Sequence, residues 1–83
     1  MRVLYFAWVR EAVGADEERV APPAHVATVA DLISWLSGRS DGHARAFADR
    51  SRLRAAVDQA FVGLDASVAD ATEVAIFPPV TGG

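Results

Sequence analysis

The clearest chemical feature of the sequence is its ending, which reads Phe77-Pro78-Pro79-Val80-Thr81-Gly82-Gly83. Its two prolines hold the backbone extended, and the six residues from Pro78 can reach about 20 Å at roughly 3.3 Å per residue. Side chains become smaller toward Gly82 and Gly83. An arm whose tip has no Cβ atoms can enter a narrow channel in another protein. We therefore expect residues 78–83 to deliver the carboxylate of Gly83 to a partner.

A terminal carboxylate can do two kinds of chemistry once it is activated. It is a poor electrophile until an ATP-using enzyme converts it into an acyl-adenylate. A sulfur nucleophile can then replace the nucleotide and leave a thiocarboxylate on Gly83, whereas an amine acceptor would give an isopeptide bond. The sequence holds no cysteine, so the chain has no thiol of its own to carry sulfur. It also holds no lysine, so no side-chain amine could accept an activated terminus from another copy.

Other kinds of site have little support in the sequence. It contains no phosphate-binding loop, dinucleotide-binding glycine motif or zinc-protease motif. We interpret His25 and His43 as isolated surface residues, and the acidic residues 16–18 as a solvated strand edge. We therefore expect no bound metal and no cofactor held by the chain itself.

Size and composition limit the possible classes. The chain has 83 residues, of which 52% are hydrophobic and 23% charged, with a formal net charge of −3. This predicts one small globular domain, which we place at residues 1–77, followed by the tail 78–83. The acidic balance disfavours nucleic acid. Because the start resembles no signal peptide and no apolar run is long enough to span a bilayer, we expect no membrane partner and a cytoplasmic location.

Local patterns predict the elements that must position this tail. Thr28, followed three residues later by Asp31, is typical of a capping box. Apolar residues at helical spacing follow this cap, which predicts a helix that ends at Gly38. The remaining pattern predicts strands over 3–9, 16–21 and 73–77, a hairpin over 53–62 that turns at Asp58-Gln59, a helical turn over 10–14 and a weaker helix over 41–49.

One helix can cover only one face of such a sheet, yet both faces are expected to be apolar. In the first strand Val3 and Tyr5 would point one way, and Leu4, Phe6 and Trp8 the other. Phe61 and Phe77 add large apolar side chains. Two interpretations remain open: loops cover the second face, or Phe6, Phe61 and Phe77 form an exposed patch that docks a partner protein.

Four segments resemble the small subunit of molybdopterin synthase, the MoaD family. They are the opening VLYFAWVREAVG, the helix TVADLISWL, the hairpin AAVDQAFV and, most specifically, the ending EVAIFPPVTGG. The resemblance implies a ubiquitin-like β-grasp fold of the α+β class, a mixed sheet with one main helix packed on one face. The sequence departs from the family at Asp58, where asparagine is usual.

The resemblance also implies a function. Gly83 would be adenylated by an enzyme related to ubiquitin-activating enzymes, with ATP, and converted to a thiocarboxylate. The tail, Pro78 to Gly83, would then enter the large synthase subunit and give its sulfur to cyclic pyranopterin monophosphate, which forms molybdopterin. The synthase would be a heterotetramer whose pterin-binding catalytic residues lie on the large subunit. The alternatives are a sulfur carrier for thiamine or cysteine biosynthesis, a ubiquitin-like protein modifier, and an interaction module whose Gly-Gly ending is incidental.

Overall fold

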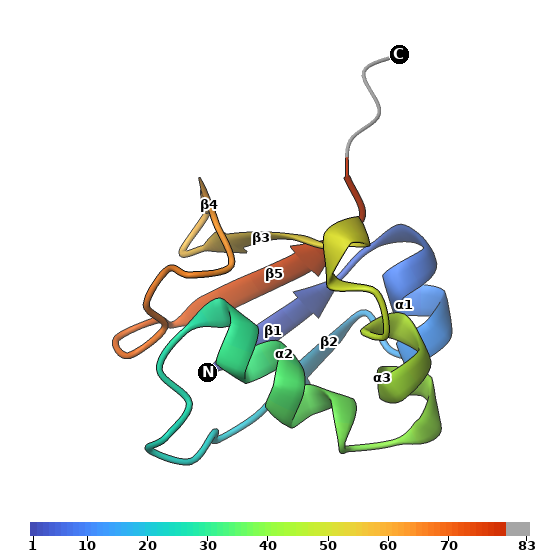
Figure 1. The fold of residues 1–83 in the computed structure, drawn as a ribbon, viewed down its shortest axis with the longest axis horizontal. Coiled ribbons are helices and arrows are strands. Elements are labelled where there is room, and N and C mark those ends of the chain that lie inside the picture. The colour runs from blue at the N-terminus through green and yellow to red at the C-terminus, as the bar shows by residue number, and fades with distance from the viewer. Residues whose placement is uncertain (80–83) are drawn as a thin grey trace.

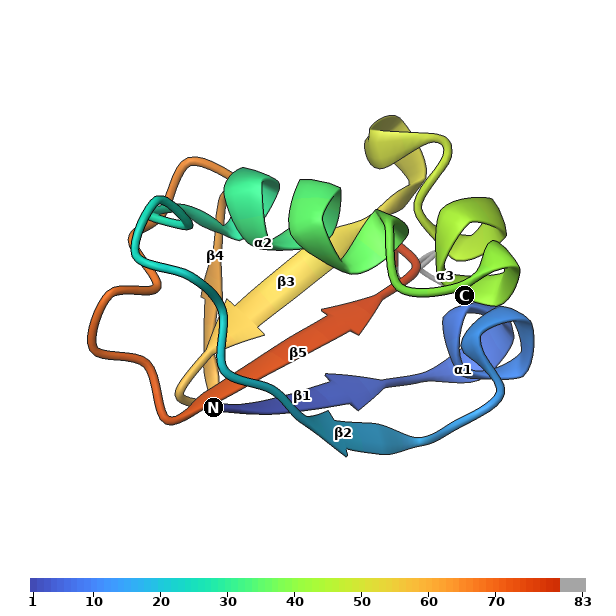
Figure 2. The ribbon, with the colours of Figure 1, turned by 90° about the horizontal axis from the view of Figure 1, so that it is seen from below.

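The computed structural model describes residues 1–79 of the chain, which form a mixed five-stranded sheet with helices on one face and at one end (Figures 1 and 2). The strands are β1 (Arg2–Tyr5), β2 (Glu17–Arg19), β3 (Arg54–Val57), β4 (Ala60–Val62) and β5 (Glu73–Phe77). The helices are α1 (Ala7–Val13), α2 (Val29–Ser37) and α3 (Asp41–Ala46), with a 3-10 turn, η1 (Arg50–Arg52).

The strands lie in the order β2-β1-β5-β3-β4. β1 pairs with β5 in parallel, and the other three pairs are antiparallel. Figure 2 shows α2 lying across one face of the sheet, while α1 and α3 pack together at the end where β1 and β5 finish. This is the predicted β-grasp arrangement with its main helix on one face. The edge position expected for the charged second strand is also confirmed.

The main helix begins where its cap was predicted. Thr28 Oγ1 accepts the Asp31 backbone N–H at 3.1 Å, and Asp31 Oδ2 accepts the Thr28 N–H at 3.1 Å. Backbone hydrogen bonds from Ala27 and Thr28 lower the pKa of Asp31. Four side chains at the spacing of one helical face, Val29, Leu32, Ile33 and Leu36, are completely buried. They meet the core side of the sheet, which Val3, Tyr5, Val74 and Ile76 form.

The strand predicted over residues 3–9 is wrong in its second half. β1 ends at Tyr5, the backbone of Ala7 takes a φ of 54°, and residues 7–13 form α1. Helix α1 closes at Gly14, whose φ of 90° lies in the left-handed region that glycine adopts without strain. A short apolar run does not distinguish a strand from a helix by its period. As a result, Trp8 lies on α1 rather than on a sheet face.

The predicted hairpin is confirmed, and its turn explains the departure at Asp58. Asp58 and Gln59 have φ values of 47° and 72°, as a two-residue turn between antiparallel strands requires. The Asp58 Oδ1 atom accepts the backbone N–H groups of Thr72 and Glu73, both at 3.0 Å. Asparagine has the same acceptor atom, so a carboxylate at this position keeps the tie between hairpin and β5.

Candidate docking surface and carrier tail

The sheet face that points away from α2 carries an apolar row across four strands. Leu4 lies opposite Ala75, Ala75 opposite Ala56, and Ala56 opposite Phe61. Residues directly opposite one another on paired strands point to the same face. The two central positions are alanines, and the larger side chains stand to either side. The centre of this face is therefore hollowed.

Three phenylalanines border this hollow, and the prolines of the tail lie at its rim. Phe61 is 83% exposed and Phe6 46%, and the rings of Phe61 and Phe77 lie 5.8 Å apart between centroids. The hollow holds about 570 Å³, and it is lined by Phe6, Ala7, Ala56, Phe61, Ala75, Phe77, Pro78 and Pro79. We call these eight residues the apolar hollow.

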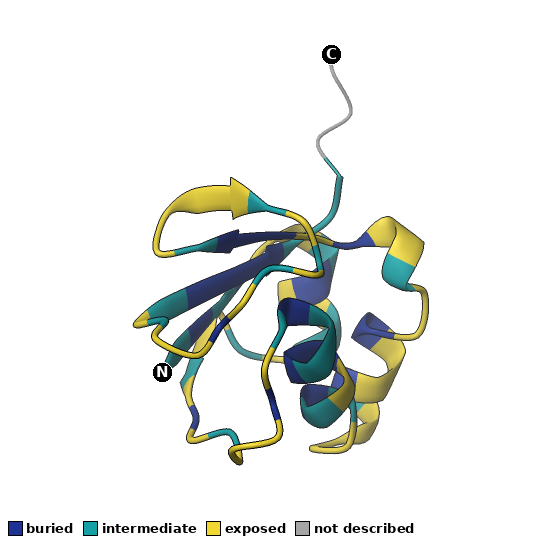
Figure 3. Cartoon of the chain, turned by 60° about the vertical axis from the view of Figure 1, so that its left-hand side comes forward, coloured by how far each residue is buried: buried dark blue, intermediate teal, exposed yellow. Residues whose placement is uncertain are grey.

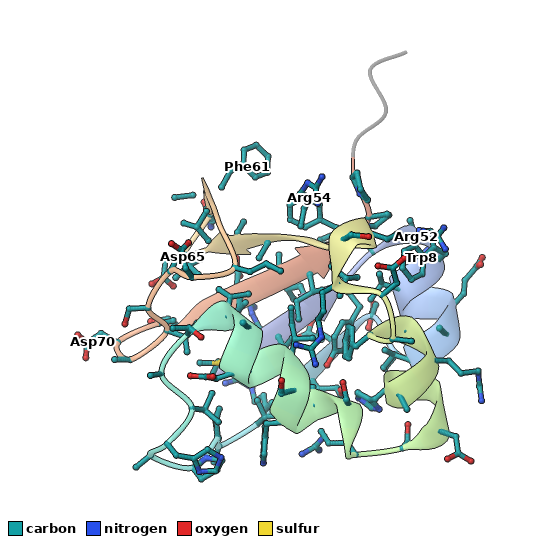
Figure 4. The ribbon with its side chains drawn as sticks, viewed as in Figure 1. Trp8, Arg52, Arg54, Phe61, Asp65 and Asp70 are labelled. Carbon is teal, nitrogen blue, oxygen red and sulfur yellow. The ribbon has the colours of Figure 1, made fainter. Side chains whose placement is uncertain are left out.

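The apolar hollow decides between the two interpretations of the second apolar face. Loops do not cover it, because Phe6 and Phe61 are the exposed large hydrophobic side chains of the described chain. Figure 3 shows exposed β4 beside the buried strands β3 and β5, and in Figure 4 the ring of Phe61 stands clear of the sheet. Phe6, Phe61, Phe77, Pro78 and Pro79 thus come together on one surface, as an exposed patch requires.

Four of the predicted tail residues, Val80, Thr81, Gly82 and Gly83, lie outside the described residues. The structure therefore places only the base of the tail. Phe77 ends β5, and Pro78 and Pro79 follow it directly along the rim of the hollow. The division into a domain over 1–77 and a tail over 78–83 stays a prediction.

Two arginines, Arg52 and Arg54, lie near the base of the tail, and Arg54 borders the apolar hollow because it lines a smaller hollow that shares Phe61 and Phe77 with it. Arg54 begins β3 and lies opposite Phe77 in the β3–β5 register, and its Nη1 donates to the carbonyl oxygens of Leu53 at 2.8 Å and Ser51 at 3.2 Å. Arg52 lies with its guanidinium carbon 4.9 Å from the centroid of the Trp8 ring. Both arginines are exposed at the surface, where the labels in Figure 4 locate them. No pattern in the sequence indicated a role for either residue.

The interpretation of His43 as a surface residue is wrong. His43 is 6% exposed, and its Nε2 lies 2.6 Å from Glu18 Oε1 while its Nδ1 lies 2.7 Å from the hydroxyl of Ser40. A carboxylate only accepts hydrogen bonds, so Nε2 donates to Glu18. In the neutral ring Nδ1 then accepts from Ser40. His25, by contrast, is exposed as expected.

The interpretation of residues 16–18 as a solvated strand edge is wrong for Glu18, which is partly buried. Its side chain is 21% exposed and accepts a second hydrogen bond from the Tyr5 hydroxyl at 2.7 Å. Burial by itself would raise the pKa of Glu18, but the hydrogen bonds from His43 and Tyr5 outweigh it, and the pKa is lowered. Burial and the bond to Glu18 raise the pKa of Tyr5. This cluster ties the edge strand β2 to α3. Its members are too far apart in the sequence for spacing to indicate it.

Residues 1–79 contain no cluster of three or more histidine and carboxylate side chains that could hold a metal ion. The same residues include no helix with the length and apolar character to cross a membrane.

The fold and this surface define a class of protein: a ubiquitin-like β-grasp domain with an apolar face beside Pro78 and Pro79. The ThiS family matches residues 3–83, and the chain belongs to that family. It is 47% identical over 83 residues to the "Molybdopterin synthase sulfur carrier subunit" of Escherichia coli strain K12 and 34% identical to the protein of that name from Haemophilus influenzae. Each match covers 100% of this chain and 99% of the relative.

Solved structures agree with this assignment. A putative molybdopterin converting factor, subunit 1, from Pyrococcus furiosus is 32% identical with a TM-score of 0.73, over 95% of each chain. Small archaeal modifier protein 1 of Haloferax volcanii is 27% identical with a TM-score of 0.73, over 96% of this chain and 97% of that one. These similarities confirm the resemblance to molybdopterin synthase small subunits and the predicted β-grasp fold.

Proposed function

We propose that this chain is the sulfur carrier subunit of a molybdopterin synthase, and that it works in molybdenum cofactor biosynthesis in the cytoplasm. The observation that carries the proposal is the full-length match to two relatives of that name, one at 47% identity. The apolar hollow beside Pro78 and Pro79 supports it, because a carrier must dock on its partner close to where its tail enters.

The carrier chemistry belongs to the carboxylate of Gly83. A carboxylate oxygen attacks the α-phosphorus of ATP in the activating enzyme, pyrophosphate leaves, and an acyl-adenylate forms. A sulfide-level sulfur nucleophile then attacks the acyl carbon and displaces AMP, which leaves a thiocarboxylate. In the synthase this sulfur passes to cyclic pyranopterin monophosphate, and the tail returns as a carboxylate. The chain binds no cofactor of its own in this scheme, since ATP is bound by the activating enzyme.

The residues of this chain position the tail rather than carry out the pterin chemistry. The two prolines hold the start of the tail extended, and Gly82 and Gly83 have no Cβ that could collide with a narrow channel. We assign the pterin-binding side chains to the large subunit, with two small and two large subunits in the assembly. Phe6, Phe61 and Phe77 form the docking contacts.

Intact mass spectrometry tests the carrier role. The chain is incubated with its activating enzyme, ATP and a sulfide donor, and we expect replacement of one oxygen by sulfur. A variant that lacks Gly83 is the matched control and must show no such change. An unchanged wild-type mass, with an enzyme proven active on another carrier, would contradict the proposal.

A second step tests the pathway. The thiocarboxylated chain is mixed with the large subunit and the precursor pterin, and we expect molybdopterin to form. Failure here after successful thiocarboxylation would favour a thiamine or cysteine pathway. The similarity to small archaeal modifier protein 1 supports a second candidate function, protein modification. Protein modification would be revealed by intact mass spectrometry as isopeptide adducts of this chain on lysines of target proteins.

A further inference from the structure

The charges of this chain are arranged unevenly around the apolar hollow. Asp65 and Asp70 lie toward the far end of the sheet from Arg52 and Arg54, as the labels in Figure 4 show. The chain as a whole has a formal net charge of −3. Arg52 and Arg54 therefore place two cations near the base of the tail of a negatively charged protein.

Arg54 is held in place without an acidic partner among the described residues. The ion pairs within residues 1–79 are Arg2–Glu73, Arg39–Glu18 and His43–Glu18. Its two hydrogen bonds go to main-chain oxygens, so they fix the direction of the guanidinium without neutralising its charge. Together with Phe61 and Phe77, Arg54 also lines a second, smaller hollow beside the first.

Arg52, in η1, adds a second cation near the base of the tail (Figure 4). It lies over the face of Trp8, an arrangement that favours a cation and holds the side chain against the surface. The pKa of Asp49 is lowered, chiefly by its hydrogen bond from Ser51 and to a smaller extent by the nearby charge of Arg52. Arg52 is thus partly compensated, and Arg54 is the stronger candidate for a contact with a partner.

We propose that the large subunit of the synthase docks on this chain with an apolar side chain in the alanine-floored hollow and at least one carboxylate against Arg54, with Arg52 in support. This inference rests on the proposed function, which supplies the partner. A preformed, exposed cation beside an apolar contact favours an acidic partner, because opposite charges speed association and orient the docked pair. An arginine also binds carboxylates in a fixed two-pronged geometry.

Charge reversal tests this contact. Binding of the large subunit is measured by surface plasmon resonance for the wild type, Arg54→Glu, Arg54→Met and the matched control Arg19→Glu. Arg19 is exposed on β2, at the opposite edge of the sheet from β3 and β4. Arg54→Met keeps an aliphatic stem without the charge. Thermal unfolding confirms that each variant is folded.

At low salt we expect Arg54→Glu to weaken binding about tenfold or more, with part of the loss in the association rate, and Arg54→Met to weaken it less. Salt should shrink the difference, and Arg19→Glu should bind like the wild type. Wild-type affinity for Arg54→Glu, or an equal loss for Arg19→Glu, would overturn the inference.

Thiocarboxylate formation, measured on the same variants, separates this inference from the proposed function. If wild-type chain is never thiocarboxylated, the proposed function fails whatever Arg54 does. If it is thiocarboxylated and binds the large subunit, but Arg54→Glu slows only thiocarboxylation, then the acidic face belongs to the activating enzyme and our assignment is wrong.

Discussion

Phe61 offers the sharpest test of the docking surface, because its ring is placed to contribute to binding far more than to folding. It is 83% exposed, whereas complete burial of a phenylalanine is worth about 1.5–3 kcal/mol. Most of that free energy is therefore still available when a partner covers the ring. If docking buries it fully, Phe61→Thr should weaken binding by about 1–2.5 kcal/mol, or roughly 5- to 70-fold in Kd.

The same substitution should leave the free chain folded. The fraction of the ring already buried contributes below about 0.5 kcal/mol, and the exposed ring contact with Phe77 adds about 1 kcal/mol at most. Threonine is β-branched, and such side chains suit a strand such as β4. We therefore expect the free energy of unfolding to fall by less than about 1.5 kcal/mol.

Two measurements check the prediction: calorimetric titration of the large subunit for Kd, and urea unfolding for stability. Leu36→Ala is the contrasting control, because Leu36 lies on the buried face of α2 and is fully buried. This variant should lose about 2–5 kcal/mol of stability. If Phe61→Thr unfolds as readily as Leu36→Ala, the ring belongs to the core. If Phe61→Thr binds the large subunit with unchanged Kd, the apolar hollow is not the docking site.

Three further predictions concern stability and self-reaction. Thr28→Ala removes the cap of α2 and should cost about 1 kcal/mol, seen as a melting temperature about 4–8 °C lower; an unchanged melting temperature would contradict it. Because the pKa of Glu18 is lowered in the folded chain, its charge stabilises the fold above the ordinary glutamate range, and that contribution disappears as pH falls through the folded pKa. Urea unfolding should thus show Glu18→Gln less stable than wild type at pH 7, with a difference that shrinks at acid pH; a gap that widens there would refute this. The chain has no lysine that could accept an activated Gly83 from another copy, and its Met1 ammonium donates a hydrogen bond to the Val20 carbonyl at 3.1 Å. Incubation with activating enzyme and ATP should therefore produce no covalent multimers on a denaturing gel.

Elements whose signals are local could be predicted from the sequence. The cap pair Thr28 and Asp31 lies within one helical turn, and the turn Asp58-Gln59 lies between strands that it joins directly. Strand β5 runs from Glu73 to Phe77 as expected, since Pro78 has no N–H to continue the ladder. The first helix was predicted only as a turn over 10–14, whereas α1 begins at Ala7, because the apolar run at 3–9 fits a strand as well as a helix.

Contacts between distant segments could not be predicted in this way. His43 meets Glu18 across 25 positions of sequence, and no spacing rule links them. The arginine beside the hollow was missed for the same reason, because Arg54 reaches Phe77 only through the pairing of β3 with β5. Contacts between segments far apart in the sequence leave no periodic pattern from which they could be predicted.

The sequence by itself led to the proposed carrier chemistry, because it ends in Gly82-Gly83 after two prolines and contains neither cysteine nor lysine. It also determined the main helix and most of the strands, because caps, turns and periodicity act over a few residues. Only the tertiary structure decided which surface lies beside Pro78 and Pro79, the base of that arm. Sheet pairing places Ala56 and Ala75 side by side between three phenylalanines, and the resulting hollow depends on the register of strands far apart in the sequence.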